Sequence, residues 1–252
     1  MRAFLLLAFS VPTLLHAQPG ALDPEFGTDG TAITMVGQIV DYVTDLAVQP
    51  DGKLVVAGYT QVVNLHQFAV ARFNSNGMLD NSFSGNGEMI VSGTQQNECH
   101  AMALQPDGKI LLAGWGNVGF TRDFVVVRLN PDGSMDTSFD GDGRVSTPVT
   151  NTTDEAYAIA VQPDGKIVVA GFAEIATLDN FAVVRYNPDG TLDTGFNGTG
   201  MLVVPVGTAD NVAQDLALQP DGRIVVAGYA GNGTDKDVAL VRVMPDGTLD
   251  TG

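Results

Sequence analysis

The sequence predicts an all-β fold, a β-propeller built from four-stranded antiparallel blades, with one repeat every 57 residues or so. Three motifs recur in one register. The peptide Gln-Pro-Asp-Gly, followed by Lys or Arg, starts at Gln49, Gln105, Gln162 and Gln219, at spacings of 56, 57 and 57 residues. A second turn ending in glycine starts at Asn74, Asn130, Asn187 and Met244. The motif Leu/Met-Asp-x-x-Phe starts at Leu22, Leu79, Met135 and Leu192. Three motifs in one register make chance similarity untenable.

Each copy consists of short apolar runs separated by turns, which is typical of β-strands. In the third copy the runs are residues 157–161, 166–172, 181–186 and 201–206. The loop at residues 163–165 is Pro-Asp-Gly, in which proline presets φ and glycine takes the left-handed conformation. Near-continuous apolar runs predict strands that are covered on both faces, as blades packed between blades would be.

The repeat divides the chain into a propeller domain over residues 18–252, with copies at about 22–78, 79–134, 135–191 and 192–248. Residues 249–252 repeat the opening of a copy. Two interpretations stay open. Either the array is longer than four copies, which we favour, or it closes at four blades. In the second case residues 31–36 would supply the outer strand of the last blade.

The repeated residues resemble the delta-60 repeat family. The resemblance rests on Leu-Asp-x-x-Phe-x-x-x-Gly, on Gln-Pro-Asp-Gly-Lys-Ile-x-x-Ala-Gly and on Phe-x-x-x-Arg-x-Asn-Pro-Asp-Gly, and it covers about residues 22–252. It implies a β-propeller in an exported bacterial protein, and it implies no catalytic residues.

The N-terminus predicts export. Arg2 precedes a mostly apolar stretch, and Ala17 supplies a small residue at a plausible cleavage point, so residues 1–17 have the pattern of a signal peptide. No stretch is long enough to predict a membrane span. We therefore expect a protein that is secreted or held at the cell surface. Its single cysteine, Cys99, excludes an intrachain disulfide.

The formal charge of −17 argues against nucleic acid as a partner, because nucleic-acid binding needs positive potential. The expected partner is an unknown extracellular ligand, either a glycan or a protein.

An arginine precedes an aspartate by eight residues in every copy, across a turn that ends in glycine. Counting outward from the turn places the two side chains opposite each other on paired strands, close enough for an ion pair. We therefore predict one structural pair per blade: Arg72–Asp80, Arg128–Asp136, Arg185–Asp193 and Arg242–Asp250.

Calcium is the one cofactor that the sequence leaves open. Calcium takes six to eight oxygen ligands, usually with several carboxylates among them. Only one Gly-rich turn offers two carboxylates at alternate positions, Asp140 and Asp142. We interpret these turns first as structural, with a weak calcium site as the alternative.

Two columns of varied polar residues precede the Gln-Pro-Asp-Gly hairpins. If the strand that follows is the innermost one, both columns ring one mouth of the central channel, where we expect any small ligand or cation to bind. The alternative is that they cap the starts of strands by bonding to nearby backbone. The first column, five residues before the glutamine, is Thr44, His100, Tyr157 and Gln214. The second, eight residues before it, is Asp41, Asn97, Asp154 and Asn211.

No nucleophile or phosphate-binding motif occurs, and His66 and His100 are the only histidines outside the predicted signal peptide. The leading hypothesis is a non-enzymatic binding or surface-scaffold module. One rival is a lactonase-type hydrolase with a channel-mouth metal held by Asp and Asn. The other is a calcium-stabilised adhesion repeat.

Overall fold

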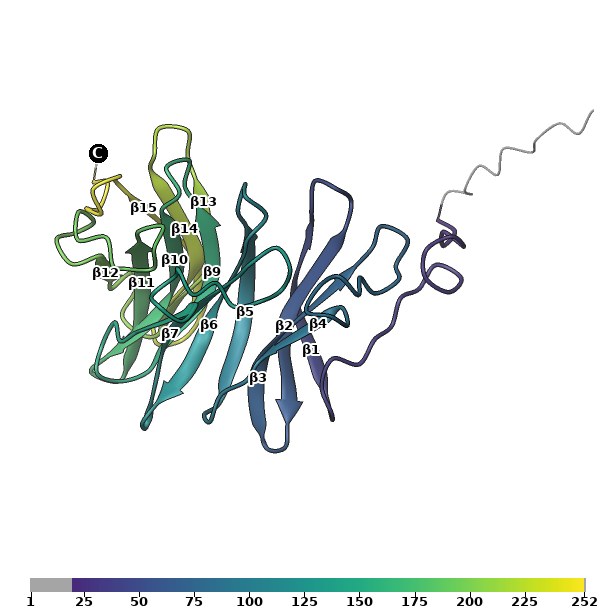
Figure 1. Ribbon diagram of the computed structural model, residues 1–252. Coiled ribbons are helices and arrows are strands. Elements are labelled where there is room, and N and C mark those ends of the chain that lie inside the picture. The colour runs from purple at the N-terminus through teal and green to yellow at the C-terminus, as the bar shows by residue number, and fades with distance from the viewer. Residues whose placement is uncertain (1–19, 252) are drawn as a thin grey trace, which may run out of the picture.

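The computed structural model describes residues 20–251, which form four antiparallel β-sheets (Figure 1). The predicted signal peptide lies outside the described residues. No helix within residues 20–251 is long and apolar enough to cross a membrane. The predicted fold class is confirmed: the sheets are the blades of a β-propeller, one for each copy of the repeat.

Each blade follows the chain, because within a blade every strand pairs with the next one in sequence. Blade 1 contains β1 (Asp41–Val48), β2 (Leu54–Val62), β3 (Leu65–Phe73) and β4 (Glu88–Val91). Blade 2 contains β5 (Asn97–Leu104), β6 (Ile110–Val118), β7 (Thr121–Leu129) and β8 (Arg144–Thr147). Blade 3 contains β9 (Asp154–Val161), β10 (Ile167–Ile175), β11 (Leu178–Tyr186) and β12 (Met201–Val204). Blade 4 contains β13 (Asn211–Leu218), β14 (Ile224–Gly231) and β15 (Lys236–Val243).

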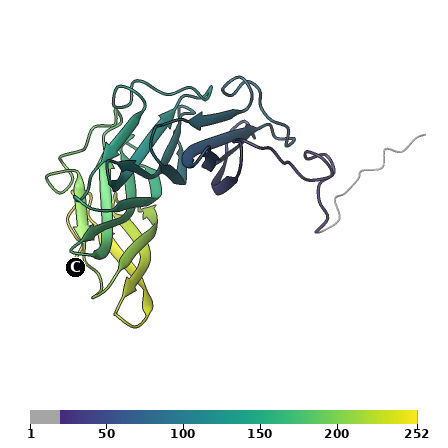
Figure 2. The ribbon, with the colours of Figure 1, turned by 90° about the horizontal axis from the view of Figure 1, so that it is seen from below.

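The blades lie along an arc, with blade 1 and blade 4 at its two ends (Figure 2). The first strands, β1, β5, β9 and β13, contact one another in that order. Blade 4 has three strands among the described residues. Residues 31–36, which a four-blade closure would add to it as the outer strand, lie outside every named strand, and Ile33 and Met35 are exposed.

The hydrophobic core is divided among the spaces between neighbouring blades. Leu112 packs in the cluster between blades 1 and 2, whereas the adjacent Leu111 packs in the cluster between blades 2 and 3. A third cluster joins blades 3 and 4. Successive residues of a strand point to opposite faces, so a strand between two cores is apolar at every position. This explains the continuous apolar runs.

The three repeated motifs meet at one aspartate in each blade. In blade 2, Arg128 Nε lies 2.6 Å from Asp136 Oδ2, and Lys109, from the Gln-Pro-Asp-Gly-Lys hairpin, lies 3.3 Å from the same oxygen. Arg128 also donates to the Pro188 carbonyl oxygen of blade 3, and its guanidinium lies over the Phe139 ring. The other predicted pairs form in the same way, with Nε–Oδ2 distances of 2.7 Å in Arg72–Asp80, Arg185–Asp193 and Arg242–Asp250.

Replacing Arg128 with alanine should destabilise the protein by about 1–3 kcal/mol, because it leaves the buried Asp136 carboxylate without its arginine partner. The matched control is Arg242→Ala. The Arg242 side chain is 46% exposed, against 5% for Arg128, so its loss should cost clearly less. Urea denaturation of both variants measures the difference. Equal losses would contradict the role assigned to burial and to the contact with the next blade.

The same aspartate makes stability depend on pH. Burial alone would raise the pKa of Asp136, but hydrogen bonds from the Ser138 side chain and backbone, then from Arg128 and Lys109, outweigh it and lower the pKa from 3.8 to about 2. The folded state therefore holds fewer protons than the unfolded state between these values. The stabilisation is present above pH 3.8 and is lost as the pH falls through about 2.

We expect the urea midpoint of the native sequence to fall steeply below pH 4 or so, and that of Asp136→Asn to fall less steeply. Asp193, whose pKa is also lowered, adds to the slope in both proteins. If the urea midpoints of the two proteins fell equally steeply with decreasing pH, the contribution of Asp136 would be refuted.

Candidate functional site

Each inner strand contains a β-bulge at the same place in the repeat. The pairing of β1 with β2 skips Thr44, and that of β5 with β6 skips His100. The pairing of β9 with β10 skips Tyr157, and that of β13 with β14 skips Gln214. The first predicted column is therefore the set of bulged residues. A bulge leaves one residue out of the ladder and redirects its side chain, and bulges are common beside binding sites.

A glycine opposite each bulge makes the distortion sterically feasible. A Cβ on Gly171 would lie 1.9 Å from the Glu155 carbonyl oxygen and 2.8 Å from the Ala156 Cα. The equivalent positions, with the same 1.9–2.0 Å approach to a carbonyl oxygen, are Gly58, Gly114 and Gly228. The recurring Ala-Gly-aromatic tripeptide of the second strand is therefore a consequence of the bulge in the first.

Gly171→Ala should destabilise the protein by roughly 1–3 kcal/mol, because the added methyl group collides with backbone that cannot move without breaking the bulge. Gly93→Ala is the control. Its Cβ would meet nothing closer than 3.4 Å, so its thermal midpoint should stay near that of the native sequence. A Gly171→Ala midpoint equal to that of the control would show that the bulge is easily lost.

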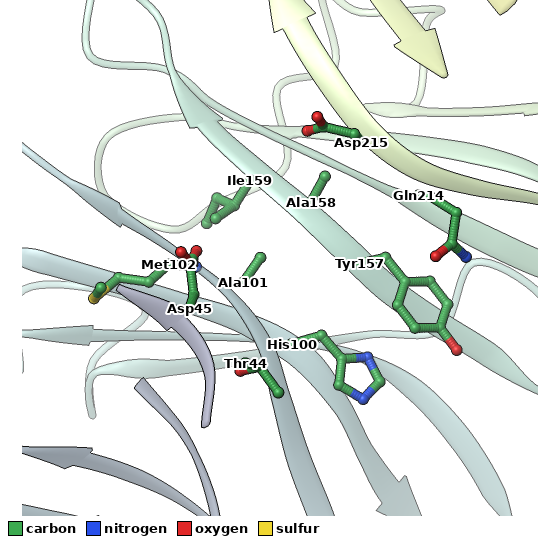
Figure 3. A pocket seen from close by; sticks show the side chains of 10 residues that line it. All are labelled: Thr44, Asp45, His100, Ala101, Met102, Tyr157, Ala158, Ile159, Gln214 and Asp215. Atoms are coloured by element: carbon green, nitrogen blue, oxygen red, sulfur yellow. Dashed lines mark hydrogen bonds between the residues drawn. The ribbon is translucent and has the colours of Figure 1, made fainter. Parts of the chain in front are cut away.

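The bulged residues line one pocket, which has a volume of about 500 Å³ (Figure 3). They come from the inner strands of four different blades. The His100 and Tyr157 rings are stacked, with centroids 4.7 Å apart and planes 8° apart. The remaining lining consists of Asp45, Ala101, Met102, Ala158, Ile159 and Asp215.

Several polar atoms of the pocket are already used to hold adjacent blades together. Thr44 Oγ1 donates to the Cys99 carbonyl oxygen of blade 2, and His100 Nδ1 lies 3.1 Å from the Ala156 carbonyl oxygen of blade 3. The Asp45 carboxylate accepts from the backbone N–H of Met102 in blade 2. Gln214, by contrast, is exposed, and its side-chain amide makes no hydrogen bond to another described residue.

The Tyr157 side chain of the stacked pair is connected to a network of charged groups. The Tyr157 hydroxyl donates to Glu155, which also pairs with Arg122, and Arg122 lies over the Trp115 ring. Burial, and then the negative charge of Glu155, raise the pKa of Tyr157, so the phenol keeps its proton. Burial likewise raises the pKa of the Cys99 thiol and leaves it unreactive. Neither group is set up as a nucleophile.

The second predicted column does not line this pocket. Three of its members accept hydrogen bonds from the backbone of the loop that precedes their strand. Asp41 accepts from Val36 and Gly37, Asp154 from Thr150, and Asn211 from Gly207. Asn97 accepts from the backbone N–H of Phe68 in blade 1. Asn97, Asp154 and Asn211 are buried. The geometry of this column is that of strand-start caps, the alternative weighed above.

The calcium candidates form turn contacts. Asp142 accepts from the backbone N–H of Arg144, and Asp140 adopts a left-handed conformation with φ of 50°. Within residues 20–251 no group of three or more His, Cys, Asp or Glu side chains is placed to hold a metal ion. Burial, followed by the charges of Asp142 and Asp189, raises the pKa of Asp140.

The alignment of copies identified the pocket residues by their variation, but it did not identify the bulge. The available signal was the glycine in the Ala-Gly-aromatic tripeptide, since a glycine inside an apolar strand indicates a bulge or a close backbone approach. The neighbours Asp45 and Asp215 were also missed, because the other two copies have alanine at that position.

Solved structures that resemble this chain are distant in sequence. XC5397 from Xanthomonas campestris, a gluconolactonase, is 14% identical with a TM-score of 0.45, and the match covers 88% of this chain and 62% of that one. A glycoside hydrolase is 13% identical with a TM-score of 0.41, over 84% of this chain and 48% of that one. The chain thus spans less than two thirds of the length of these proteins. No curated protein sequence matches it.

The sequence also matches a family description, at one stretch per repeat. The matched stretches are residues 49–83, 105–139, 162–196 and 219–252, which together make up more than half of the chain. Each begins at the Gln-Pro-Asp-Gly hairpin, and the first three end at the phenylalanine whose ring lies under the arginine of the Arg–Asp pair. The chain therefore belongs to the family described as a domain of unknown function (DUF5122) beta-propeller.

Proposed function

We propose that this protein is an exported, non-enzymatic binding module whose bulge-lined pocket takes a small, neutral, hydroxyl-rich ligand such as a sugar. The observation that carries the proposal is the bulge. The fold repeats the same distortion in every blade, and each time it presents a different polar or aromatic side chain to one pocket. The predicted export and the delta-60 resemblance belong to this proposal.

The chemistry of the lining supports a neutral polar ligand. The pocket volume falls in the range of small-molecule sites. Gln214 offers a free amide donor and acceptor, and Tyr157 and His100 offer ring edges beside polar atoms. Asp45 and Asp215 disfavour an anion at the same place.

The hydrogen bonds of the second column, whose members cap the starts of strands, favour a binding function over metal-dependent hydrolysis. A lactonase-type centre would need Asp41, Asn97, Asp154 and Asn211 to converge on one ion. Asp41, Asp154 and Asn211 each accept instead from the backbone of a separate loop. Asn97 accepts from the backbone N–H of Phe68 in β3 and donates to the Gln95 carbonyl oxygen of the loop before its strand. The pocket holds no nucleophile with an adjacent base of the kind that acyl transfer requires.

A panel of neutral mono- and disaccharides, screened by thermal shift and followed up by calorimetry, tests the proposal. At least one sugar should bind, and Gln214→Ala should weaken it by about tenfold through loss of the amide contacts. Gln61→Ala, which removes an amide outside the pocket, should leave the affinity unchanged. A panel without a binder, or equal losses in the two variants, would refute the pocket as a sugar site.

The two rivals are tested with the same protein. A sugar lactone incubated with it should hydrolyse at the uncatalysed rate. Turnover that is lost in His100→Ala would establish the hydrolase instead. Calcium should shift the calorimetric midpoint no more than magnesium does at equal ionic strength. A calcium-specific shift that disappears in the double variant Asp140→Asn, Asp142→Asn would support the hypothesis of a calcium-stabilised adhesion repeat instead.

A further inference from the structure

Blade 2 departs from the repeat at two positions that touch each other. Arg144 begins the outer strand β8, where the equivalent residues of blades 1 and 3 are Glu88 and Met201. Gly116 lies near the end of β6, where the equivalent residues are Thr60, Ala173 and Ala230. The first column differs in all three blades and contains one arginine, and in the second column only blade 2 has a glycine.

The two departures fit each other sterically. A Cβ built on Gly116 would lie only 2.7 Å from Arg144 Nη2. The alanine or threonine found at this place in the other blades would therefore push the guanidinium away. Gly116 leaves the space in which the guanidinium rests, so the pair forms one local feature that the repeat itself does not require.

The guanidinium lines a separate pocket of about 190 Å³, on the side where blade 1 connects to blade 2. The connecting loop is held in place, because the backbone N–H of Asn117 donates to the Gln96 carbonyl oxygen and the Asn97 amide donates to the Gln95 carbonyl oxygen. Asn97 also lines this pocket, as do the side chains of Thr94, Gln95 and Asn117, and these last three make no hydrogen bond to other described residues.

Arg144 is the one arginine among residues 20–251 without an ion pair to a described carboxylate. It is only partly exposed, and burial lowers its pKa, while the charge of Asp142 acts in the opposite direction. The Asp142 carboxylate accepts from the Arg144 backbone N–H at 2.8 Å, and it does not reach the guanidinium within ion-pair distance. A partly desolvated cation therefore faces a pocket that contains further donors.

We propose that this pocket binds a small carboxylate, which the Arg144 guanidinium holds through its planar pair of donors, with the Asn117 amide and the Thr94 hydroxyl as additional donors. A guanidinium and a carboxylate match each other geometrically and form two parallel hydrogen bonds. The volume suits a carboxylate group and a few atoms around it. The carboxylate belongs either to a free small acid or to an acidic sugar. The site is separate from the bulge-lined pocket and does not depend on its ligand.

Titration of the protein with sodium acetate, and separately with sodium glucuronate, tests the proposal against sodium chloride at equal ionic strength. Amide chemical shifts should change at Thr94, Gly116, Asn117 and Arg144 with both acids and not with chloride. Tighter binding of glucuronate would assign the site to acidic sugars, and equal binding would assign it to the carboxylate group alone. Shifts spread evenly over the surface, or none at these amides, would overturn the proposal.

Three variants separate a built site from general electrostatics. Arg144→Met installs the residue that blade 3 has at this position, and it should reduce acetate affinity at least tenfold. Gly116→Ala keeps every charge but displaces the guanidinium, and it should also weaken binding. Lys236→Met removes one positive charge elsewhere and should leave the affinity unchanged. Retained binding in Arg144→Met, or an equal loss in Lys236→Met, would overturn the proposal. The titration of the native protein decides the matter even if one variant fails to fold.

Discussion

The buried carboxylate of the Leu/Met-Asp-x-x-Phe motif is the interaction on which both the blade and the contact between blades depend. It accepts from the arginine of the third strand and from the lysine of the first hairpin, and so it ties three segments of one copy together. The same arginine reaches the proline carbonyl of the next blade. The neighbouring phenylalanine lies against the glycine of that blade's turn, at Gly133 for Phe83. Folding within a blade and stacking between blades therefore share one set of contacts.

This sharing of contacts explains why apolar side chains are exposed on the two end blades, blade 1 and blade 4. Every blade presents one face to the blade before it and another to the blade after it, and both faces are built from the same repeated positions. At the ends of the described chain these faces have no neighbour. Val43 of blade 1, and Val238 and Leu240 of blade 4, are consequently exposed. The corresponding positions of blades 2 and 3, such as Phe124 and Val126, are fully buried.

The sequence predicted the features that every copy must contain, because repetition separates them from chance. The strands, the turns and the Arg–Asp pairs belong to this class. The sequence could not decide the role of the two polar columns. Their members lie three residues apart on the same strand, and one member can point into the channel while the other points into a loop. The bulge made that difference: it directs Tyr157 into the pocket, while Asp154, at the start of the same strand, bonds to Thr150. A ladder without the bulge would have given the column a different direction.

Departures from the repeat could not be interpreted from the sequence, because their meaning depends on contacts between residues that are far apart in the chain. Arg144 and Gly116 are separated by 27 intervening residues, and nothing in either column alone shows that they touch. The structure brings them together on a frame that the Arg–Asp pairs of blades 1 and 2 stabilise. A partly buried arginine on such a frame needs little reordering to meet an anion, which lowers the entropic cost of binding. The net negative charge of the chain disfavours anions in general, so the proposed selection of a small carboxylate at this one place rests on the local arginine.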